Sequence, residues 1–291
     1  MTPPRRYVSD DDDSARWDGF PFRDGDIVIS TRSKSGTTWM QMVCALLVFQ
    51  SPELPAPLPQ LSPWVDHTVE PVADVVARLE AQRHRRFVKT HTPLDGIPVD
   101  PRATYVVVGR HPLDLAVSLY HQGDNIDRER MAVLTGVPQR QRAPRPSLHD
   151  WLVGWTTRST TALEQPDSLD GVLHHLTDAW QREQPNVVLV HYADLLADLE
   201  GEMRRLAGRL GIDVPEDVWP SLVEGARFDS MRARSDELVP NALGIFKDPS
   251  LFFRSGRSGT GADVLTAAEL AAYEARVRSL APPDLVAWLH R

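Results

Sequence analysis

The chain has 291 residues, of which 42% are hydrophobic and 25% are charged, and its formal net charge at pH 7 is −8. These proportions are typical of a globular protein, and the length suits one α/β domain. The negative net charge argues against broad affinity for nucleic acid, which depends on a basic surface that neutralises many phosphates. Any anion-binding site in this protein must therefore be local.

The N-terminal segment is charged and contains prolines. Residues 1–14 include the acidic run Asp10-Asp11-Asp12-Asp13 but no apolar stretch of the kind found in secretory signals. We therefore expect a mobile acidic tail over residues 1–20, a single domain over residues 21–291 and a cytoplasmic location. No 18 consecutive apolar residues occur, so the sequence predicts no membrane-spanning helix.

The first predicted strand covers residues 26–30, and a tight loop and a helix that reaches Phe49 follow it. The backbone N–H groups at the start of such a helix have no partner within it and favour an anion. Lys34 adds positive charge, and Gly36 lets a ligand approach the backbone closely. The loop is not a Walker motif, because Lys34 precedes Gly36 by two positions. A solvated lysine beside an ordinary helix cap is the alternative for this segment. Hydroxyl donors in the loop are Ser35, Thr37 and Thr38.

The second predicted strand covers residues 86–89 and follows a proline-rich connection over residues 51–63, which we expect to be extended. Lys89 and His91 share one side of this strand, because alternate strand residues face the same way. An ordinary histidine pKa of about 6.5 suits a general base at neutral pH. Since the chain has 10 histidines, His91 alone would be a weak candidate.

The third predicted strand covers residues 104–109 and leads into a helix that contains Ser118, eight positions after Arg110. Arg110 could bind a phosphate through two hydrogen bonds, with the hydroxyl of Ser118 adding a third. A surface ion pair and an ordinary helical serine are the alternative. Residues 122–146 then form either a lid or a solvated linker.

The fourth predicted strand covers residues 186–191 and is followed by Tyr192. Phe228 and a glycine-rich segment that contains Arg254 come later, before a final helix predicted over residues 266–289. Without further context, Tyr192 fits a structural corner, Phe228 fits a core position and the glycine-rich segment fits a flexible loop.

Strands that alternate with helices predict a sheet of parallel strands joined by crossover connections. We therefore predict an α/β fold, a three-layer sandwich with a central parallel sheet and a P-loop-like strand-loop-helix phosphate site. Ligands of such sheets bind beyond the carboxyl ends of the strands. Four candidate residues follow such ends and should surround one site, namely Lys34, His91, Arg110 and Tyr192.

Taken together, these motifs resemble those of the cytosolic-type sulfotransferases. Residues 34–39 are similar to the core of that family's phosphosulfate loop, Tyr-Pro-Lys-Ser-Gly-Thr-Thr-Trp, although Arg32-Ser33 replaces the usual Tyr-Pro. Residues 110–118 resemble the family's 3′-phosphate element and keep its spacing, and residues 89–91 resemble its Lys-Thr-His motif. The glycine-rich segment departs from the family pattern Arg-Lys-Gly-x-x-Gly, because Ser255 replaces the lysine.

The resemblance implies a donor and a set of roles. The donor would be 3′-phosphoadenosine 5′-phosphosulfate. We also predict that no metal is required, because the sequence shows no evident cluster of metal ligands and a monoanionic sulfonate needs less charge neutralisation than a terminal phosphoryl group. His91 would take the proton of the acceptor hydroxyl, while Lys34 and Lys89 would stabilise the transferring group. The residues implied in donor binding are Lys34, Ser35, Gly36, Thr37, Thr38, Trp39, Arg110, Ser118, Tyr192, Phe228, Arg254, Ser255 and Gly256.

The implied reaction moves a sulfuryl group to a hydroxyl of a small molecule. A phenol, a steroid, a lipid or a sugar fits equally as acceptor, because the pocket would be built from residues 51–66 and 122–155, whose shape the sequence does not give. An ATP-dependent small-molecule kinase with an atypical phosphate loop and a non-catalytic nucleotide-binding module are the alternatives. A homodimer is compatible with the sequence.

Overall fold

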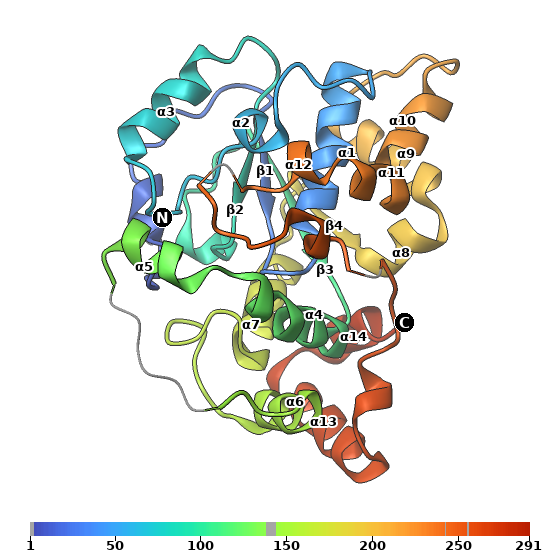
Figure 1. The fold of residues 1–291 in the computed structure, drawn as a ribbon. Coiled ribbons are helices and arrows are strands. Elements are labelled where there is room, and N and C mark those ends of the chain that lie inside the picture. The colour runs from blue at the N-terminus through green and yellow to red at the C-terminus, as the bar shows by residue number, and fades with distance from the viewer. Residues whose placement is uncertain (1–2, 138–143, 242, 255) are drawn as a thin grey trace.

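A computed structural model describes residues 3–137, 144–241, 243–254 and 256–291 (Figure 1). Its centre is a parallel sheet of four strands in the order β2-β1-β3-β4. In the register, Ile27 pairs with Phe87 on one side and with Thr104 on the other. The strands are β1 (Ile27–Ser30), β2 (Phe87–Thr90), β3 (Thr104–Gly109) and β4 (Val187–His191). Each lies within one residue of its predicted bounds.

Alternate strand residues enter two separate hydrophobic cores. Ile29 and Val106 face α1 (Thr37–Phe49), α9 (Leu199–Leu210) and α10 (Trp219–Ala226). Val28 and Val107 belong to the other core, to which α3 (Val72–Ala81) contributes Val75 and Leu79 and which a second group of helices covers (Figure 1). These helices are α4 (Pro112–Asn125), α6 (Leu148–Thr157), α7 (Leu169–Trp180), α13 (Ala267–Leu280) and α14 (Pro283–Leu289). The sheet therefore lies between two helical layers, as the alternating pattern of the sequence predicts.

The connections contain shorter helices. The proline-rich segment is mostly irregular but includes one helical turn, and part of the segment predicted as lid or linker is helical. Within that segment, residues 138–143 lie outside the described residues. The shorter helices are α2 (Leu58–Leu61), α3 (Val72–Ala81), α5 (Arg128–Thr135), α8 (Tyr192–Ala197), α11 (Phe228–Ala233) and α12 (Ser235–Leu238).

Two expectations need correction. The final helix is two helices, α13 and α14, because Pro282 and Pro283 cannot continue the hydrogen bonds of α13. The described part of the N-terminal segment is not a separate tail, since Tyr7 and Trp17 are 5% and 0% exposed. Both aromatic side chains are buried against the rest of the chain. The removal of their apolar surface from water favours a packed segment, although the surrounding residues are charged. Among the described helices, none has the length and apolar character needed to span a bilayer.

Candidate active site

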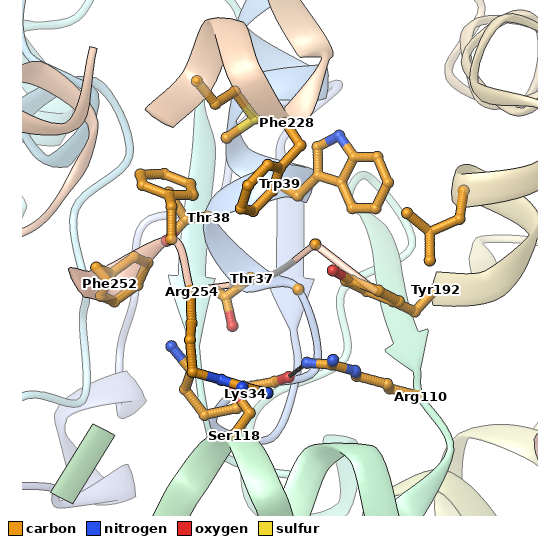
Figure 2. Close-up of a pocket in the computed structure, with 15 residues that line it drawn as sticks. Lys34, Thr37, Thr38, Trp39, Arg110, Ser118, Tyr192, Phe228, Phe252 and Arg254 are labelled. Carbon is orange, nitrogen blue, oxygen red and sulfur yellow. Dashed lines mark hydrogen bonds between the residues drawn. The ribbon is translucent and has the colours of Figure 1, made fainter. Parts of the chain in front are cut away.

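A cavity opens at the carboxyl ends of β1, β3 and β4, where the sequence predicts the site. Lys34 reaches it from the loop after β1, Arg110 follows β3, and Tyr192 follows β4. Figure 2 shows the cationic side chains on one side of this cavity and the aromatic rings of Trp39 and Phe228 on the other. The lining residues are Lys34, Gly36, Thr37, Thr38, Trp39, Arg110, Ser118, Tyr192, Leu196, Phe228, Met231, Phe252, Phe253, Arg254 and Gly256.

The loop after β1 turns sharply into α1. Lys34 and Gly36 both have positive φ angles, 64° and 106°. A Cβ on Gly36 would lie 2.9 Å from Cδ2 of Tyr192, so a larger residue does not fit there. The Thr31 and Thr37 hydroxyls lie 2.6 Å apart and join the two ends of the loop. The first turn of α1 therefore presents its free N–H groups to the cavity.

Lys34 and Arg110 lie close together and are shielded from water, whereas Arg254 is exposed. Burial, helped by the neighbouring charges of Arg110, Arg254 and Lys89, lowers the pKa of Lys34 to about 7. The Nη1 group of Arg110 donates to the carbonyl oxygen of Lys34 at 3.0 Å, and its guanidinium lies 4.3 Å from the ring centre of Tyr192. The Nε atom of Arg110 is shielded from solvent and has no hydrogen-bond partner among the described residues. Such a cluster of cations fits an anion that would supply the missing partners.

The other end of the cavity is aromatic. The Trp39 and Tyr192 rings meet edge to face with their centres 5.2 Å apart. The Nε1 group of Trp39 donates to the carbonyl oxygen of Ala226 at 2.8 Å, which fixes the indole. Phe228 and Met231 close this end. A flat aromatic ligand group would find apolar contact here.

The glycine-rich segment is anchored to the start of α4. The Asp114 carboxylate accepts hydrogen bonds from the backbone N–H groups of Gly259 and Gly261, at 2.7 and 2.9 Å. Gly256 has a φ of 59°, and a Cβ there would lie 2.6 Å from the ring of Phe228. This packing brings Arg254 and Gly256 to the cavity although the segment departs from the family pattern.

His91 lies just beyond β2 and is 8% exposed. Its Nδ1 atom is 2.6 Å from the carbonyl oxygen of Thr31. Because a carbonyl can only accept, Nδ1 carries the hydrogen, and Nε2 keeps its lone pair. Burial and the charges of Lys89 and Arg32 hold the pKa of His91 well below its usual value. The imidazole is therefore neutral and able to accept a proton at Nε2.

Lys89 lies beside His91 and contacts an aromatic ring. Its Nζ atom is 3.9 Å from the ring centre of Trp64, and the same indole meets the His91 ring edge to face at 4.6 Å. Burial lowers the pKa of Lys89 to about 8, and the charges of Asp12 and Asp66 oppose that shift. Lys89 also contributes to the lowered pKa of Lys34, which places the two lysines in one electrostatic environment.

Most of the predicted residues thus meet at one edge of the sheet. Ser35, Lys89 and His91 do not line the cavity itself. Ser35 is buried within the loop, whereas the other two lie at the end of the adjacent strand β2. Ser255 lies outside the described residues.

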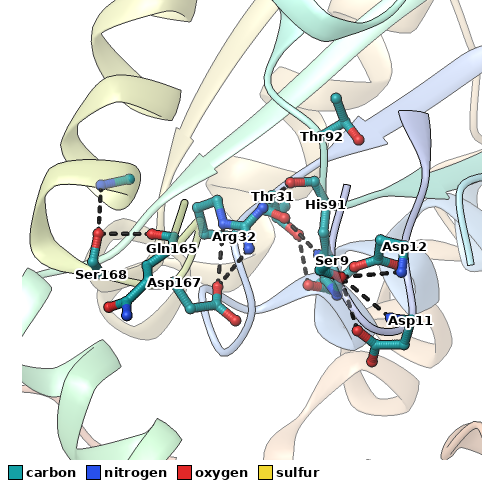
Figure 3. A network of polar contacts seen from close by, with 12 residues as sticks. Ser9, Asp11, Asp12, Thr31, Arg32, His91, Thr92, Gln165, Asp167 and Ser168 are labelled. Atoms are coloured by element: carbon teal, nitrogen blue, oxygen red, sulfur yellow. Dashed lines mark hydrogen bonds and ion pairs between the residues drawn. The ribbon is translucent and has the colours of Figure 1, made fainter. Parts of the chain in front are cut away.

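Sequence reasoning missed Arg32, which replaces a tyrosine of the family pattern. Figure 3 shows its guanidinium between His91 and Asp167. It donates to the carbonyl oxygen of His91 and, at 2.7 Å, to the carboxylate of Asp167 in the loop before α7. The unusual residue at position 32 was a signal that this part of the site differs.

Among the described residues, no three or more His, Cys, Asp or Glu side chains are grouped so that they could hold a metal ion.

Comparison with known proteins identifies the family. A model described as the sulfotransferase domain matches residues 24–280. The glycolipid sulfotransferase of Mycobacterium bovis (strain BCG / Pasteur 1173P2) is 44% identical over 299 residues, which cover 96% of this chain and 91% of that protein. Sulfotransferase 2B1 of Homo sapiens is 26% identical over 265 residues, which cover 88% of this chain and 66% of that protein.

Solved structures share the fold. Mouse sulfotransferase SULT7A1 complexed with PAP matches with a TM-score of 0.68 and 18% identity, over 95% of this chain and 91% of that one. Retinol dehydratase in complex with androsterone and the inactive cofactor PAP matches with a TM-score of 0.66 and 20% identity, over 92% and 83%. These matches confirm the predicted fold class. The domain model and the close relatives together show that this chain belongs to the sulfotransferase domain family and is a sulfotransferase.

Proposed function

We propose that this sulfotransferase takes its sulfuryl group from 3′-phosphoadenosine 5′-phosphosulfate. The observation that carries this proposal is the pairing, in one cavity, of three cationic side chains with an aromatic recess. A donor with two separate anionic groups and a flat base matches both ends of such a cavity. The solvent-shielded Nε group of Arg110 also requires an acceptor, which a phosphate oxygen would supply.

Each end of the donor has its own residues in this proposal. The loop N–H groups, Lys34 and the hydroxyls of Thr37 and Thr38 hold the 5′-phosphosulfate. Arg110, Ser118 and the segment around Arg254 and Gly256 hold the 3′-phosphate. The adenine lies among Trp39, Tyr192 and Phe228. Ser35 acts through the loop conformation, since its side chain is buried away from the cavity.

His91 acts as general base in the proposed transfer. Its Nε2 takes the proton of the acceptor hydroxyl while the acceptor oxygen forms a bond to sulfur. The bond between sulfur and the phosphate oxygen breaks, and adenosine 3′,5′-bisphosphate leaves. Lys34 and Lys89 stabilise the charge that develops on the leaving oxygen and on the sulfuryl group. Because these cations supply the charge neutralisation, we propose that the reaction needs no metal, so that a chelator leaves the rate unchanged.

For the acceptor, we propose a hydroxyl of a glycolipid. Support comes from the relatives at 44% identity, which carry the name glycolipid sulfotransferase and match over 96% of this chain. The polar surroundings of His91, with Arg32 and Asp167 nearby, suit a ligand that carries several hydroxyls. A panel of glycolipids, free sugars, phenols and steroids, assayed with labelled donor, tests this choice. Preferred transfer to a phenol or steroid would contradict it.

The cytoplasmic location and the homodimer stay predictions of the sequence.

Replacement of His91 with alanine tests the mechanism. We expect His91→Ala to lower kcat by about 10²- to 10⁴-fold, the usual contribution of a general base. Isothermal titration calorimetry should give a nearly unchanged Kd for adenosine 3′,5′-bisphosphate, because His91 lies outside the donor cavity. Near-normal turnover would remove His91 from the mechanism. Tighter binding of magnesium-ATP than of the bisphosphate would contradict the proposed donor.

A further inference from the structure

A buried carboxylate outside the predicted site contacts the segment that carries His91. Asp66 is 0% exposed. Its Oδ2 atom accepts hydrogen bonds from the hydroxyls of Thr90 and Thr92, at 2.8 and 2.7 Å, and from the backbone N–H of His91 at 3.3 Å. One carboxylate oxygen thus holds three consecutive residues at the end of β2. Hydrogen bonds to a buried charged group are among the stronger ones in proteins.

The N-terminal segment packs on Asp66 from the other side. The backbone N–H of Asp13 donates to the carbonyl oxygen of Asp66 at 2.8 Å, and Asp12 pairs with His67 in an antiparallel bridge. The Oδ1 atoms of Asp12 and Asp66 are both shielded from solvent and have no hydrogen-bond partner among the described residues. Burial and the charge of Asp66 hold the pKa of Asp12 well above its usual value. The N-terminal segment therefore covers Asp66, which is 0% exposed.

We infer that Asp66 is a positioning residue for sulfuryl transfer: it fixes the backbone at His91 so that the imidazole faces the acceptor hydroxyl, and the N-terminal segment holds Asp66 in place through the backbone N–H of Asp13. The inference rests on the proposed role of His91 as general base. It adds to that role a group that touches neither donor nor acceptor.

The geometry explains why the loss of Asp66 would lower the rate of sulfuryl transfer. The ring of His91 is oriented by one hydrogen bond, from Nδ1 to the carbonyl oxygen of Thr31. The backbone of His91 makes two hydrogen bonds. Arg32 donates to its carbonyl oxygen, and Asp66 accepts from its N–H. Without the carboxylate, two threonine hydroxyls and one N–H lose their acceptor in a region closed to water. A displacement of about 1 Å in a catalytic group can lower the rate by about 10²-fold.

Two substitutions of Asp66 test the inference. In Asp66→Ala, we expect kcat to fall by about 10- to 100-fold, whereas the donor KM and the Kd of adenosine 3′,5′-bisphosphate change by less than about twofold. In Asp66→Asn, the side-chain carbonyl can still accept from Thr90 and Thr92, so most of kcat should return. A purely structural role would not produce this split between kcat and binding or this recovery.

Asp26→Asn is the matched control. Asp26 is also a buried carboxylate, 1% exposed, and it pairs with Arg86 before the start of β1, at the opposite end of the sheet from His91. We expect this variant to unfold at a lower temperature but to keep the kcat of the parent when assayed well below that temperature. Circular dichroism spectra of all variants at the assay temperature show whether each is folded.

Thr90→Val combined with Thr92→Val keeps the inference testable if Asp66→Ala does not fold. These substitutions remove two donors to Asp66 but preserve the branched shape of the side chains. We expect a loss of kcat of about tenfold with donor binding unchanged.

An unchanged kcat in folded Asp66→Ala, or in the double valine variant, would overturn the inference. So would a parallel loss of kcat and bisphosphate affinity that Asp66→Asn does not restore. One assay series distinguishes the positioning role of Asp66 from the proposed role of His91 as base. An inactive His91→Ala together with a fully active Asp66→Ala would refute only the positioning role, whereas an active His91→Ala would refute the proposed base and with it the inference.

Discussion

The lowered pKa of Lys34 predicts that donor binding takes up a proton. In the free protein this pKa is about 7, because the amine is buried among other cations. A bound bisphosphate would place negative charge beside the amine and restore a pKa near the ordinary value of about 10.5. Between these two values, the bound state holds more protons than the free state. The affinity is therefore highest below pH 7 and falls as the pH rises above it.

The size of the effect follows from the titration of one group. The protonated fraction of free Lys34 falls from about one half at pH 7 to about one thirtieth at pH 8.5, if its pKa is about 7. If only the protonated form binds the bisphosphate well, the Kd rises by about 16-fold over this range. This ratio corresponds to ~1.6 kcal/mol of binding free energy. Lys89, with a pKa of about 8, adds a smaller contribution in the same direction.

Isothermal titration calorimetry at several pH values, in buffers of different ionisation enthalpy, measures both the Kd and the protons taken up. Lys34→Met should bind the bisphosphate more weakly and with most of the pH dependence removed. Lys247→Met is the matched control, because Lys247 is an exposed lysine outside the cavity. The chain has only 3 lysines, so NMR of protein labelled at lysine ¹³Cε can follow each amine separately. A Lys34 resonance that titrates near pH 10, or a Kd independent of pH between 7 and 8.5, would refute the reasoning.

Two further substitutions in the cavity give direct predictions. Gly36→Ala should lower the free energy of unfolding by about 1–3 kcal/mol and weaken bisphosphate binding, because a Cβ at a φ of 106° would press on the Tyr192 ring. Thermal unfolding and calorimetry check this. A fully stable variant with normal binding would contradict it. Arg110→Lys should weaken bisphosphate binding by about 10- to 100-fold, because an ammonium group cannot reproduce two parallel guanidinium hydrogen bonds. Arg102→Lys, at an exposed arginine near the start of β3, is its control; equal Kd values for the two variants would show that Arg110 does not bind the ligand.

The sequence by itself determined the elements that depend on neighbouring residues. The β-branched runs at 104–109 and 186–191 became β3 and β4 because a continuous apolar stretch between polar turns suits a strand buried on both faces. The order of Lys34 and Gly36 between a strand and a helix likewise places an anion site at that helix start. Parallel strands put their carboxyl ends at one edge, so the convergence of Lys34, Arg110 and Tyr192 could also be predicted.

The break in the last helix was also within reach of the sequence. Pro282 and Pro283 remove backbone donors, and their ring geometry ends α13 at Leu280. The prediction of one helix over residues 266–289 was wrong because it did not apply this local rule to the two prolines.

The tertiary structure alone decided the surroundings of His91. Composition marks residues 1–20 as a charged tail, yet Tyr7 donates a hydrogen bond to Asp95, Trp17 joins a hydrophobic core, and both are buried. Asp66 stands alone in the sequence, and its hydrogen-bond donors lie 24 to 26 residues away. Local patterns report backbone preference and amphipathic faces, whereas such contacts depend on how distant segments pack. The loop after β1 could therefore be predicted from neighbouring residues, but the contacts that surround His91 required the folded chain.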